Sequence, residues 1–278
     1  MFPTYLNISA ADLGKGQPVH VKVLNSDTLA QYFAENIAAE IIGGELTGRG
    51  ATLIVPVGPV DQFAILAHKI NSLGLPCRNV VFINMDEYLT DDDHWVPTDH
   101  PLSFRGYMDR AFYQLLEPAL APPPENRVFP DPQNPTAIQQ LIQSRGGVDA
   151  CFGGMGINGH LAFNEPPEPG EQMSVEEFAA LPTRVLTLAR ETRTINSVTV
   201  GGEAAVVPKR AVTVGMKEIL DARRLRFYCN RPWQSAVIRR ALHGPLTPAC
   251  PASFLRQHPD ASVTLADYVA APPNIQLR

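Results

Sequence analysis

The sequence predicts an α/β protein in which a mostly parallel sheet is covered by helices on both faces. Short apolar runs alternate along the chain with segments of helical periodicity, as in strands joined by crossover helices. Residues 80–85 are almost continuously apolar, as expected for a strand buried on both faces. Residues 148–152 form another apolar run and lead into a Gly-rich stretch, which places that stretch at the edge of the sheet where such folds bind ligands. We therefore expect one Rossmann-like domain over residues 1–278.

The first half of the chain supplies three predicted strands and the helices between them. Residues 19–24 alternate weakly between apolar and polar and are predicted as the first strand. A helix is expected from 28 to about 42, capped by Ser26 or Asp27 and ended by Gly43 and Gly44. The elements predicted next are strands at 51–57 and 79–85 and helices at 61–73 and 102–116.

The second half continues the same alternation. A helix is predicted at 136–145, with Ile138, Leu141 and Ile142 facing inward, and it is followed by the strand at 148–152. The remaining predicted elements are strands at 185–188, 211–214 and 225–228 and helices at 216–221 and 232–242.

Composition narrows the class of protein. Of 278 residues, 45% are hydrophobic and 18% are charged, and the net charge of −5 gives no basic surface for nucleic acid or membrane. No apolar run approaches the length of a bilayer span, and the first residues lack the pattern of a signal peptide. The four cysteines are scattered without metal-ligand spacing, so we expect reduced, buried thiols, no metal and a cytoplasmic protein.

The Gly-rich stretch after residues 148–152 carries groups that can move protons. It contains Gly156, Asn158, His160 and Glu165 within residues 153–165. Glycines mark a loop that turns tightly or approaches a ligand closely, and His and Glu are the side chains most used as general acids and bases near neutral pH. A structural turn with a surface histidine is the alternative explanation.

A second stretch ends in paired carboxylates. The apolar residues 80–85 run directly into Asp86 and Glu87, so the acidic pair is predicted at the carboxyl end of a buried strand. Either carboxylate could instead only cap a following turn.

Together these stretches resemble the glucosamine-6-phosphate deaminase/isomerase family, whose members carry an N-M-D-E-Y strand end and a G-x-[DN]-G-H-x-x-x-N-E loop. The resemblance continues through the sequences ETR, VPK and AVTVGM, which begin at Glu191, Val207 and Ala211, and it runs from about residue 51 to about 266. It implies a sugar-phosphate substrate and no cofactor. The family includes monomers and hexamers, so a homo-oligomer is compatible with it.

The resemblance assigns the catalytic roles. Asp86 matches the carboxylate that moves a proton between C2 and C1 of the sugar, and His160 matches the acid and base that opens the ring. Glu165 matches the carboxylate partner of that histidine, and Asn158 stands where many members have Asp.

The resemblance also assigns the substrate-binding roles. Glu87, Gly58 and Gly156 match positions around the substrate, and Arg193 and Lys209 match the residues at its phosphate. It further implies a mobile lid at about 166–190, which is longer here than in compact members.

The stretch after residues 51–57 departs from the family. Members have P-T-G-[GS]-[ST] there, whereas this chain has Pro56-Val57-Gly58-Pro59-Val60 followed by Asp61. Hydroxyl groups and an N–H donor are lost, and Asp61 would repel a dianion at the start of the next helix. We therefore expect weak binding of glucosamine 6-phosphate, or a related sugar with a differently placed anionic group.

Two other functions remain open from sequence. A 6-phosphogluconolactonase shares the fold and a similar glycine–histidine loop, but residues 86–88 and 164–165 match the deaminases better. A non-catalytic sugar-phosphate sensor would be expected to carry a basic DNA-binding segment, and residues 1–50 show no basic bias.

Overall fold

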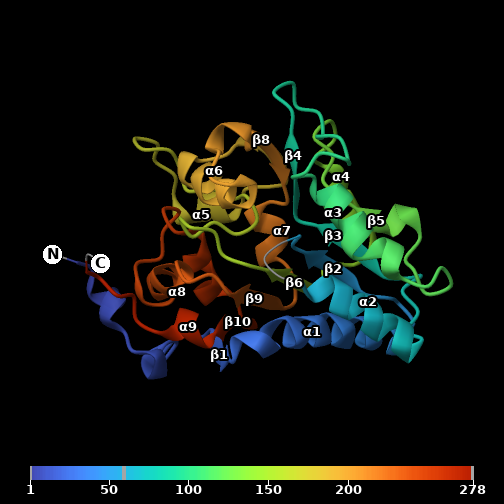
Figure 1. Ribbon diagram of the computed structural model, residues 1–278, viewed down its shortest axis with the longest axis horizontal. Coiled ribbons are helices and arrows are strands. Elements are labelled where there is room, and N and C mark those ends of the chain that lie inside the picture. The colour runs from blue at the N-terminus through green and yellow to red at the C-terminus, as the bar shows by residue number, and fades with distance from the viewer. Residues whose placement is uncertain (1, 58–60, 277–278) are drawn as a thin grey trace.

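The computed structural model describes residues 2–57 and 61–276, and it is built around two sheets. The seven strands of the main sheet are all parallel. In sheet order they are β1 (His20–Leu24), β10 (Ala261–Ala266), β9 (Leu225–Cys229), β6 (Ala150–Gly153), β2 (Thr52–Val55), β3 (Val81–Asn84) and β5 (Arg127–Val128). The small antiparallel sheet has the order β4 (Asp86–Leu89), β8 (Arg210–Thr213) and β7 (Arg184–Thr187). Figure 1 shows β4 and β8 standing above the main sheet.

Helices connect and cover these strands. The α-helices are α1 (Ser26–Leu46), α2 (Gln62–Leu73), α3 (Phe104–Ala111), α4 (Ala137–Ser144), α5 (Val175–Ala179), α6 (Arg190–Asn196), α7 (Met216–Leu220), α8 (Gln234–His243) and α9 (Asp267–Ala270). Among the helices of the described ranges, none combines the length and the apolar character that a bilayer span requires. Among the 3₁₀ segments of the described residues, η5 (Ser197–Val200) matters most here, because its residue Thr199 lines the pocket described below.

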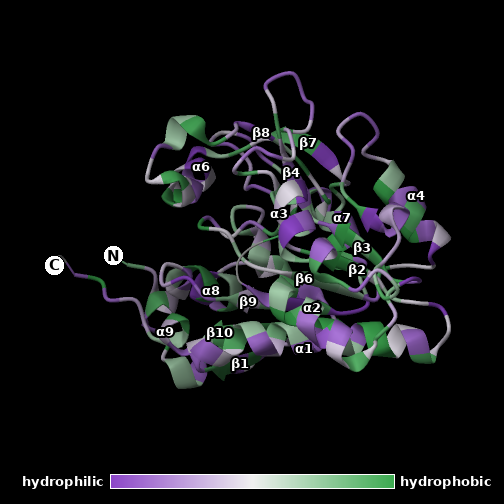
Figure 2. Ribbon diagram, turned by 45° about the vertical axis from the view of Figure 1, so that its right-hand side comes forward, coloured by the Kyte–Doolittle hydropathy of each residue, from purple (hydrophilic) through white to green (hydrophobic). Residues whose placement is uncertain are grey.

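The predicted α/β architecture is confirmed. The order of the strands explains why helices cover both faces of the main sheet. From β1 to β2 and on to β3 the chain steps across the sheet in one direction, and from β6 to β9 and β10 it steps in the other. Right-handed crossovers therefore place α1 and α2 on one face, and α7 and α8, which lead into β9 and β10, on the opposite face. Phe33 of α1 stacks on Phe152 of β6 and Tyr228 of β9. Figure 2 shows β2 and β3 largely in hydrophobic green.

Three predicted boundaries were wrong. Asn25, rather than Ser26 or Asp27, caps α1 by accepting a hydrogen bond from the Asp27 N–H. The helix continues through Gly43 and Gly44 to Leu46, because a glycine at 44 lets the helix approach the chain entering β2, where a Cβ would lie 2.5 Å from the Ala51 nitrogen. The helix predicted at 102–116 is divided into α3 and a 3₁₀ turn at Tyr113–Leu115.

The carboxylate pair does not end a strand, as predicted, but begins one. β3 ends at Asn84, and Asp86 and Glu87 open β4 in the small sheet. Met85 joins the two sheets, because its N–H donates to the Val55 carbonyl at the end of β2 while its carbonyl accepts from the Val214 N–H after β8. The strand β10, the short β5, and the helices α5, α6 and α9 were not predicted.

Candidate active site

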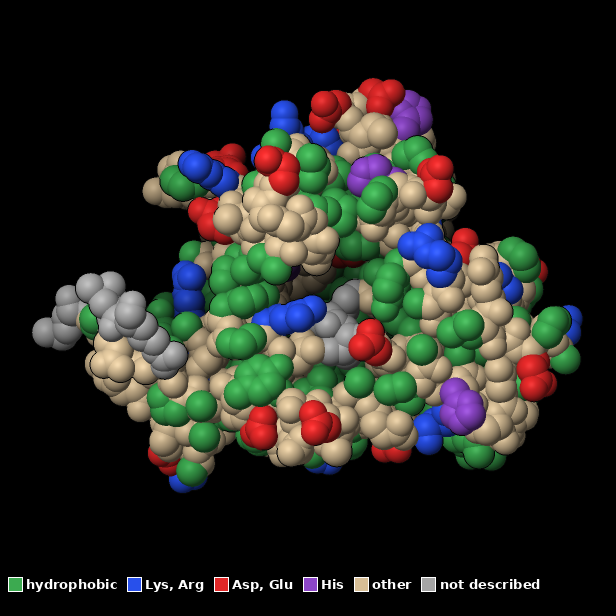
Figure 3. All heavy atoms as spheres, in the orientation of Figure 1, with side chains coloured by type: hydrophobic (Ala, Val, Ile, Leu, Met, Phe, Trp, Pro, Cys, Tyr) green, Lys and Arg blue, Asp and Glu red, His purple; other side chains and the backbone are tan. Residues whose placement is uncertain are grey.

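A pocket of about 490 Å³ lies at the carboxyl edge of the main sheet. Its lining includes Pro56 and Val57 after β2 and Gly154, Met155 and Gly156 after β6. β2 and β6 are neighbours whose chains lead away in opposite directions, and such a switch in strand order is where open α/β sheets bind ligands. Figure 3 shows the surface hollowed there, with hydrophobic side chains around the hollow.

Asp86 lines this pocket from the first position of β4. Its side chain is nearly inaccessible, with 6% of the residue exposed, and its carboxylate accepts no hydrogen bond from any described residue. Burial, and secondarily the neighbouring charge of Glu87, raises the pKa of the Asp86 carboxyl well above its ordinary value. A carboxyl with a raised pKa that faces a cavity is suited to taking and returning a proton.

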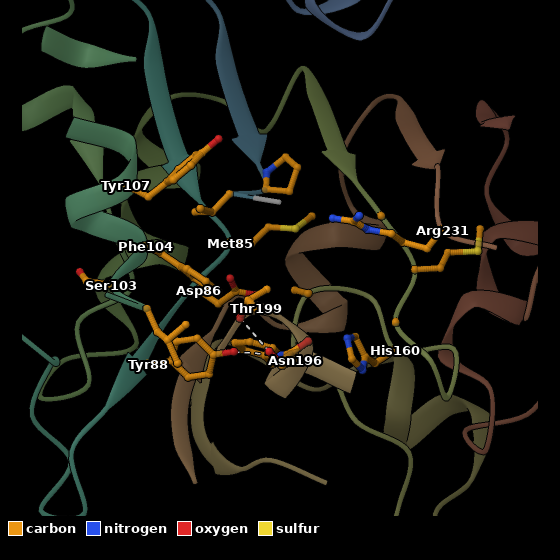
Figure 4. A pocket seen from close by; sticks show the side chains of 18 of the residues that line it. Met85, Asp86, Tyr88, Ser103, Phe104, Tyr107, His160, Asn196, Thr199 and Arg231 are labelled. Carbon is orange, nitrogen blue, oxygen red and sulfur yellow. Dashed lines mark hydrogen bonds between the residues drawn. The ribbon is translucent and has the colours of Figure 1, made fainter. Parts of the chain in front are cut away.

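His160 faces the same pocket from the loop after β6, as Figure 4 shows. Its Nδ1 lies 3.0 Å from Asn158 Oδ1 and 3.2 Å from Glu165 Oε2, and the Thr192 hydroxyl is 3.2 Å away. Because Nδ1 faces these oxygens, it carries the ring proton in the neutral form, and Nε2 is left to exchange a proton in the pocket.

The partners of His160 hold one another in place. Asn158 Nδ2 donates to Glu165 Oε2 over 2.7 Å, and the Ala189 N–H donates to Glu165 Oε1 over 3.3 Å. Burial by itself would raise the pKa of the Glu165 carboxyl, but the charge of His160 and the hydrogen bonds from His160, Asn158 and Thr192 outweigh it and keep that pKa below its usual value. Glu165 is therefore held as a carboxylate beside the imidazole.

Two glycines give the loop its close packing. A Cβ on Gly156 would lie 2.1 Å from Cε1 and Nε2 of His160, so the imidazole rests directly on the glycine backbone. Gly159 has φ of +91°, a conformation that favours glycine, and a Cβ there would lie 2.7 Å from Cys250 Sγ. Gly156 thus makes room for the imidazole of His160, and the sequence signal for it was the glycine spacing itself.

The structure does not bring the Glu87 carboxylate into the pocket. Glu87 is fully buried, and its oxygens accept hydrogen bonds from the backbone N–H groups of Tyr88, Phe104 and Arg105 and from the Ser103 hydroxyl and Arg105 Nε. The carboxylate compensates the positive N-terminal end of α3. Glu87 therefore fixes α3, whose residue Phe104 lines the pocket, and does not line the pocket itself.

Two other predicted binding residues, Arg193 and Lys209, fall outside the pocket. Arg193 donates from Nε and Nη2 to the carbonyl oxygens of Val207 and Ala204, and Lys209 is exposed; neither lines the cavity. Gly58 lies outside the described residues. Of the residues assigned from sequence, the structure thus brings Asp86, His160 and Gly156 to the pocket, with Asn158 and Glu165 directly behind His160.

Several lining residues were missed from sequence. Tyr88, Phe104 and Phe163 form an aromatic cluster in the wall, with ring centroids 4.9 to 6.0 Å apart. Ala162 also lines the pocket and has a φ of 52°, which is uncommon for a residue other than glycine and typical of functional sites. Arg231 follows β9, so the rule that ligands bind where parallel strands end would have found it.

The segment predicted as a lid contains α5 and β7. Ser174 and Glu177 form a capping box at the start of α5, and β7 is paired along its length with β8. No residue of 166–190 is among the described residues that line the pocket. That the segment moves stays a prediction. In the described ranges, no cluster of three or more His, Cys, Asp and Glu side chains is arranged to hold a metal ion.

Comparison with known proteins gives matches over most of the chain. A glucosamine-6-phosphate deaminase of Lachnoclostridium phytofermentans is 30% identical over 256 residues, which covers 87% of this chain and 98% of that protein. The solved structure of a monomeric glucosamine-6-phosphate deaminase of the NagB superfamily superposes with a TM-score of 0.76 at 26% identity, covering 91% of this chain and 99% of that one. A 6-phosphogluconolactonase from Trypanosoma cruzi shares the fold, with a TM-score of 0.66 at 17% identity over 91% of this chain and 96% of that one. No family model matches.

Proposed function

Because this chain belongs to the glucosamine-6-phosphate deaminase family, we propose that it is an aldose–ketose isomerase that releases ammonia from an amino-sugar phosphate or a closely related sugar. The simplest reaction of this kind converts glucosamine 6-phosphate and water to fructose 6-phosphate and ammonia. The observation that carries the proposal is the pairing of Asp86 and His160 in one pocket, with each side chain in the setting that its proposed role needs.

His160 acts first, on the cyclic sugar. Its Nε2 exchanges protons with the ring oxygen and the C1 hydroxyl, so that the C1–O5 bond breaks and the open-chain aldehyde forms. Asn158 and Glu165 fix the orientation of the imidazole through Nδ1, and the Glu165 carboxylate stabilises the ring when it is protonated. Since Asn158 is neutral, Glu165 supplies the negative charge in this hydrogen-bonded group.

Asp86 then moves the proton between the two carbons. The carboxylate removes the proton from C2 while the C1 oxygen takes up a proton through His160, so that C1–C2 becomes an enolamine. The same carboxyl then returns its proton to C1, and the nitrogen gives up a proton to leave a ketimine. Water adds to C2 of the ketimine, and ammonia leaves with the ketose phosphate as the other product. Because Asp86 is buried and its pKa is raised, it binds a proton more readily than an exposed carboxylate does.

Product analysis tests the proposal. Ammonia and ketose phosphate are measured separately on glucosamine 6-phosphate and related amino-sugars, with 6-phosphogluconolactone hydrolysis measured in parallel because lactonases share the fold. We expect the two deaminase products in equal amounts. Lactone hydrolysis without ammonia release would instead indicate a 6-phosphogluconolactonase. The absence of turnover on every sugar would favour a non-catalytic sugar-phosphate sensor.

Two substitutions connect the activity to the proposed residues. Asp86→Asn should lower kcat by about 10²-fold or more, whereas Asp91→Asn, an exposed carboxylate outside the pocket, should leave it unchanged. His160→Gln should slow the cyclic substrate much more than an open-chain analogue, because only the cyclic form needs ring opening. Equal losses on both forms would count against the ring-opening role.

A further inference from the structure

The pocket has a cationic side chain that the sequence resemblance does not assign. Arg231 follows β9 at the carboxyl edge of the main sheet, and of the described residues that line the cavity it is the one Lys or Arg. Figure 4 shows its guanidinium extending from the wall that carries β9 toward the side of the cavity where Met85 lies. Arg231 and His160 approach the cavity from neighbouring strands, because β9 pairs with β6.

A buried glutamine fixes the backbone of this arginine. Gln234, which is 2% exposed, accepts a hydrogen bond from the Arg231 N–H over 2.7 Å and donates to the Met155 carbonyl over 2.8 Å. Met155 belongs to the Gly-rich loop that also carries His160. The loop after β9 and the loop after β6 are thus joined through one side chain, so the base of Arg231 is held in a set place relative to His160.

The other charged residues in and near the pocket do not favour binding of an anion away from Arg231. Asp61, at the N-cap of α2, and Asp86 are the acidic residues among the described lining, and both repel a phosphate or a carboxylate. Arg193 directs its guanidinium to the carbonyl oxygens of Val207 and Ala204, and Lys209 is exposed outside the cavity. An anionic group inside the pocket is therefore most favourably placed at Arg231.

We propose that Arg231 binds the anionic end of the substrate, whether that group is a phosphate or a carboxylate, and so determines which sugars the pocket accepts. The inference rests on the proposed function in that it takes the substrate to be a sugar with one anionic end. A guanidinium offers paired N–H donors that match two oxygens of either group. With the anion at Arg231, the sugar lies across the cavity toward Asp86 and His160, and the loop after β2 does not have to supply the missing hydroxyl groups.

Calorimetric titration tests this without any turnover. Glucose 6-phosphate, glucuronate and glucose are titrated into the wild-type protein and into the variants Arg231→Gln, Lys209→Gln and Arg190→Gln. Arg190 is the matched control, because it is an exposed arginine of α6 outside the pocket. We expect at least one of the two anionic sugars to bind more tightly than glucose, and Arg231→Gln to weaken that binding by about tenfold or more, as for the loss of a charged hydrogen bond. Arg190→Gln and Lys209→Gln should bind as the wild type does.

The two anionic probes identify the group that Arg231 accepts, and the other results decide the proposal. Unchanged affinity in Arg231→Gln would overturn it, as would equal binding of glucose and both anions by the wild type. A loss confined to Lys209→Gln would place the anion where the family resemblance implies it. Because only binding is measured, these results stand whether or not ammonia release is found. If turnover is found, Arg231→Gln should raise KM with little change in kcat, as expected for a contact remote from the reacting carbons.

Discussion

Replacing Gly156 with alanine should displace His160, the proposed ring-opening residue, without disturbing the fold. Gly156 does not adopt a positive φ, so an alanine fits its backbone conformation. Its Cβ, however, would lie 2.1 Å from Cε1 and Nε2 of His160, whereas ordinary contacts begin at 3.4 Å. The imidazole would have to move by about 1 Å, and its Nδ1 hydrogen bonds with Asn158 and Glu165, now 3.0 and 3.2 Å long, would be strained or lost.

A displacement of that size is expected to be costly for catalysis. Misplacing a catalytic group by about 1 Å can reduce the rate by roughly 10²-fold. We therefore expect Gly156→Ala to lower kcat on the cyclic substrate by about that factor, measured as ammonia and ketose release. Gly43→Ala is the matched control, because the same added methyl group meets no atom within 4 Å and lies on the exposed side of α1. Gly43→Ala should keep full activity and gain about 0.5–1 kcal/mol of stability.

A double-mutant cycle separates this explanation from a general loss of structure. In a His160→Ala background the ring is absent, so Gly156→Ala has nothing to displace and should cost little further activity. If Gly156→Ala keeps a kcat within about threefold of the wild type, or if the two losses multiply, the reasoning about the ring and the glycine is refuted. Urea unfolding of each variant shows whether the protein remains folded.

The adjacent carboxylates should respond in opposite ways to neutralisation. Glu87→Gln should lower the free energy of unfolding by roughly 3–5 kcal/mol, because the backbone N–H groups of α3 and the Arg105 side chain lose their buried carboxylate. Asp86→Asn should leave that free energy unchanged or raise it at neutral pH. The reason is that the raised pKa of Asp86 makes its ionised form unfavourable in the folded state. These assignments would be contradicted if both variants unfolded at a lower urea concentration than the wild type. For Glu165 the pKa is lowered in the folded protein, so its carboxylate contributes stability above the unfolded value near 4.5, and this is lost as the pH falls. The wild type should therefore lose more stability than Glu165→Gln between pH 7 and pH 3. If the free energies of unfolding of the two proteins fell equally over this range, the Glu165 carboxylate would not be stabilised in the folded protein.

Much of the candidate site was predictable because the proposed catalytic groups lie close together in the sequence. The short loop from Gly153 to Glu165 places His160 and both of its partners within a few residues of one another, so their contacts depend little on the rest of the fold. The parallel sheet could also be predicted from sequence, because strands such as β2 and β3 are largely apolar and buried along their length. β10 was missed because its polar residues Ser262 and Thr264 obscure the apolar pattern of a strand that is largely buried.

The residue proposed to bind the anionic group was harder to predict from sequence, because its position depends on contacts between segments that are distant in the chain. The resemblance placed Arg193 and Lys209 at the anion, yet the guanidinium of Arg193 bonds to the backbone of residues 204 and 207. Arg231 carries no motif of its own, and its place in the pocket follows from the pairing of β9 with β6 and from the hydrogen bonds of Gln234. Such long-range pairing is not encoded in the spacing of residues along the chain.

Asp86 and Glu87 show the limit of local reasoning most directly. In a strand, successive side chains point to opposite faces, so two adjacent carboxylates cannot both face one cavity. Sequence pattern identified the pair but treated it as the end of β3, where the chain leaves the sheet and no such alternation applies. Because the chain instead enters β4, Asp86 faces the pocket and Glu87 faces the N-terminus of α3. The buried charge of Glu87 then acts on Asp86 across one residue and helps to raise its pKa, so the residue that anchors the helix also tunes the proposed base.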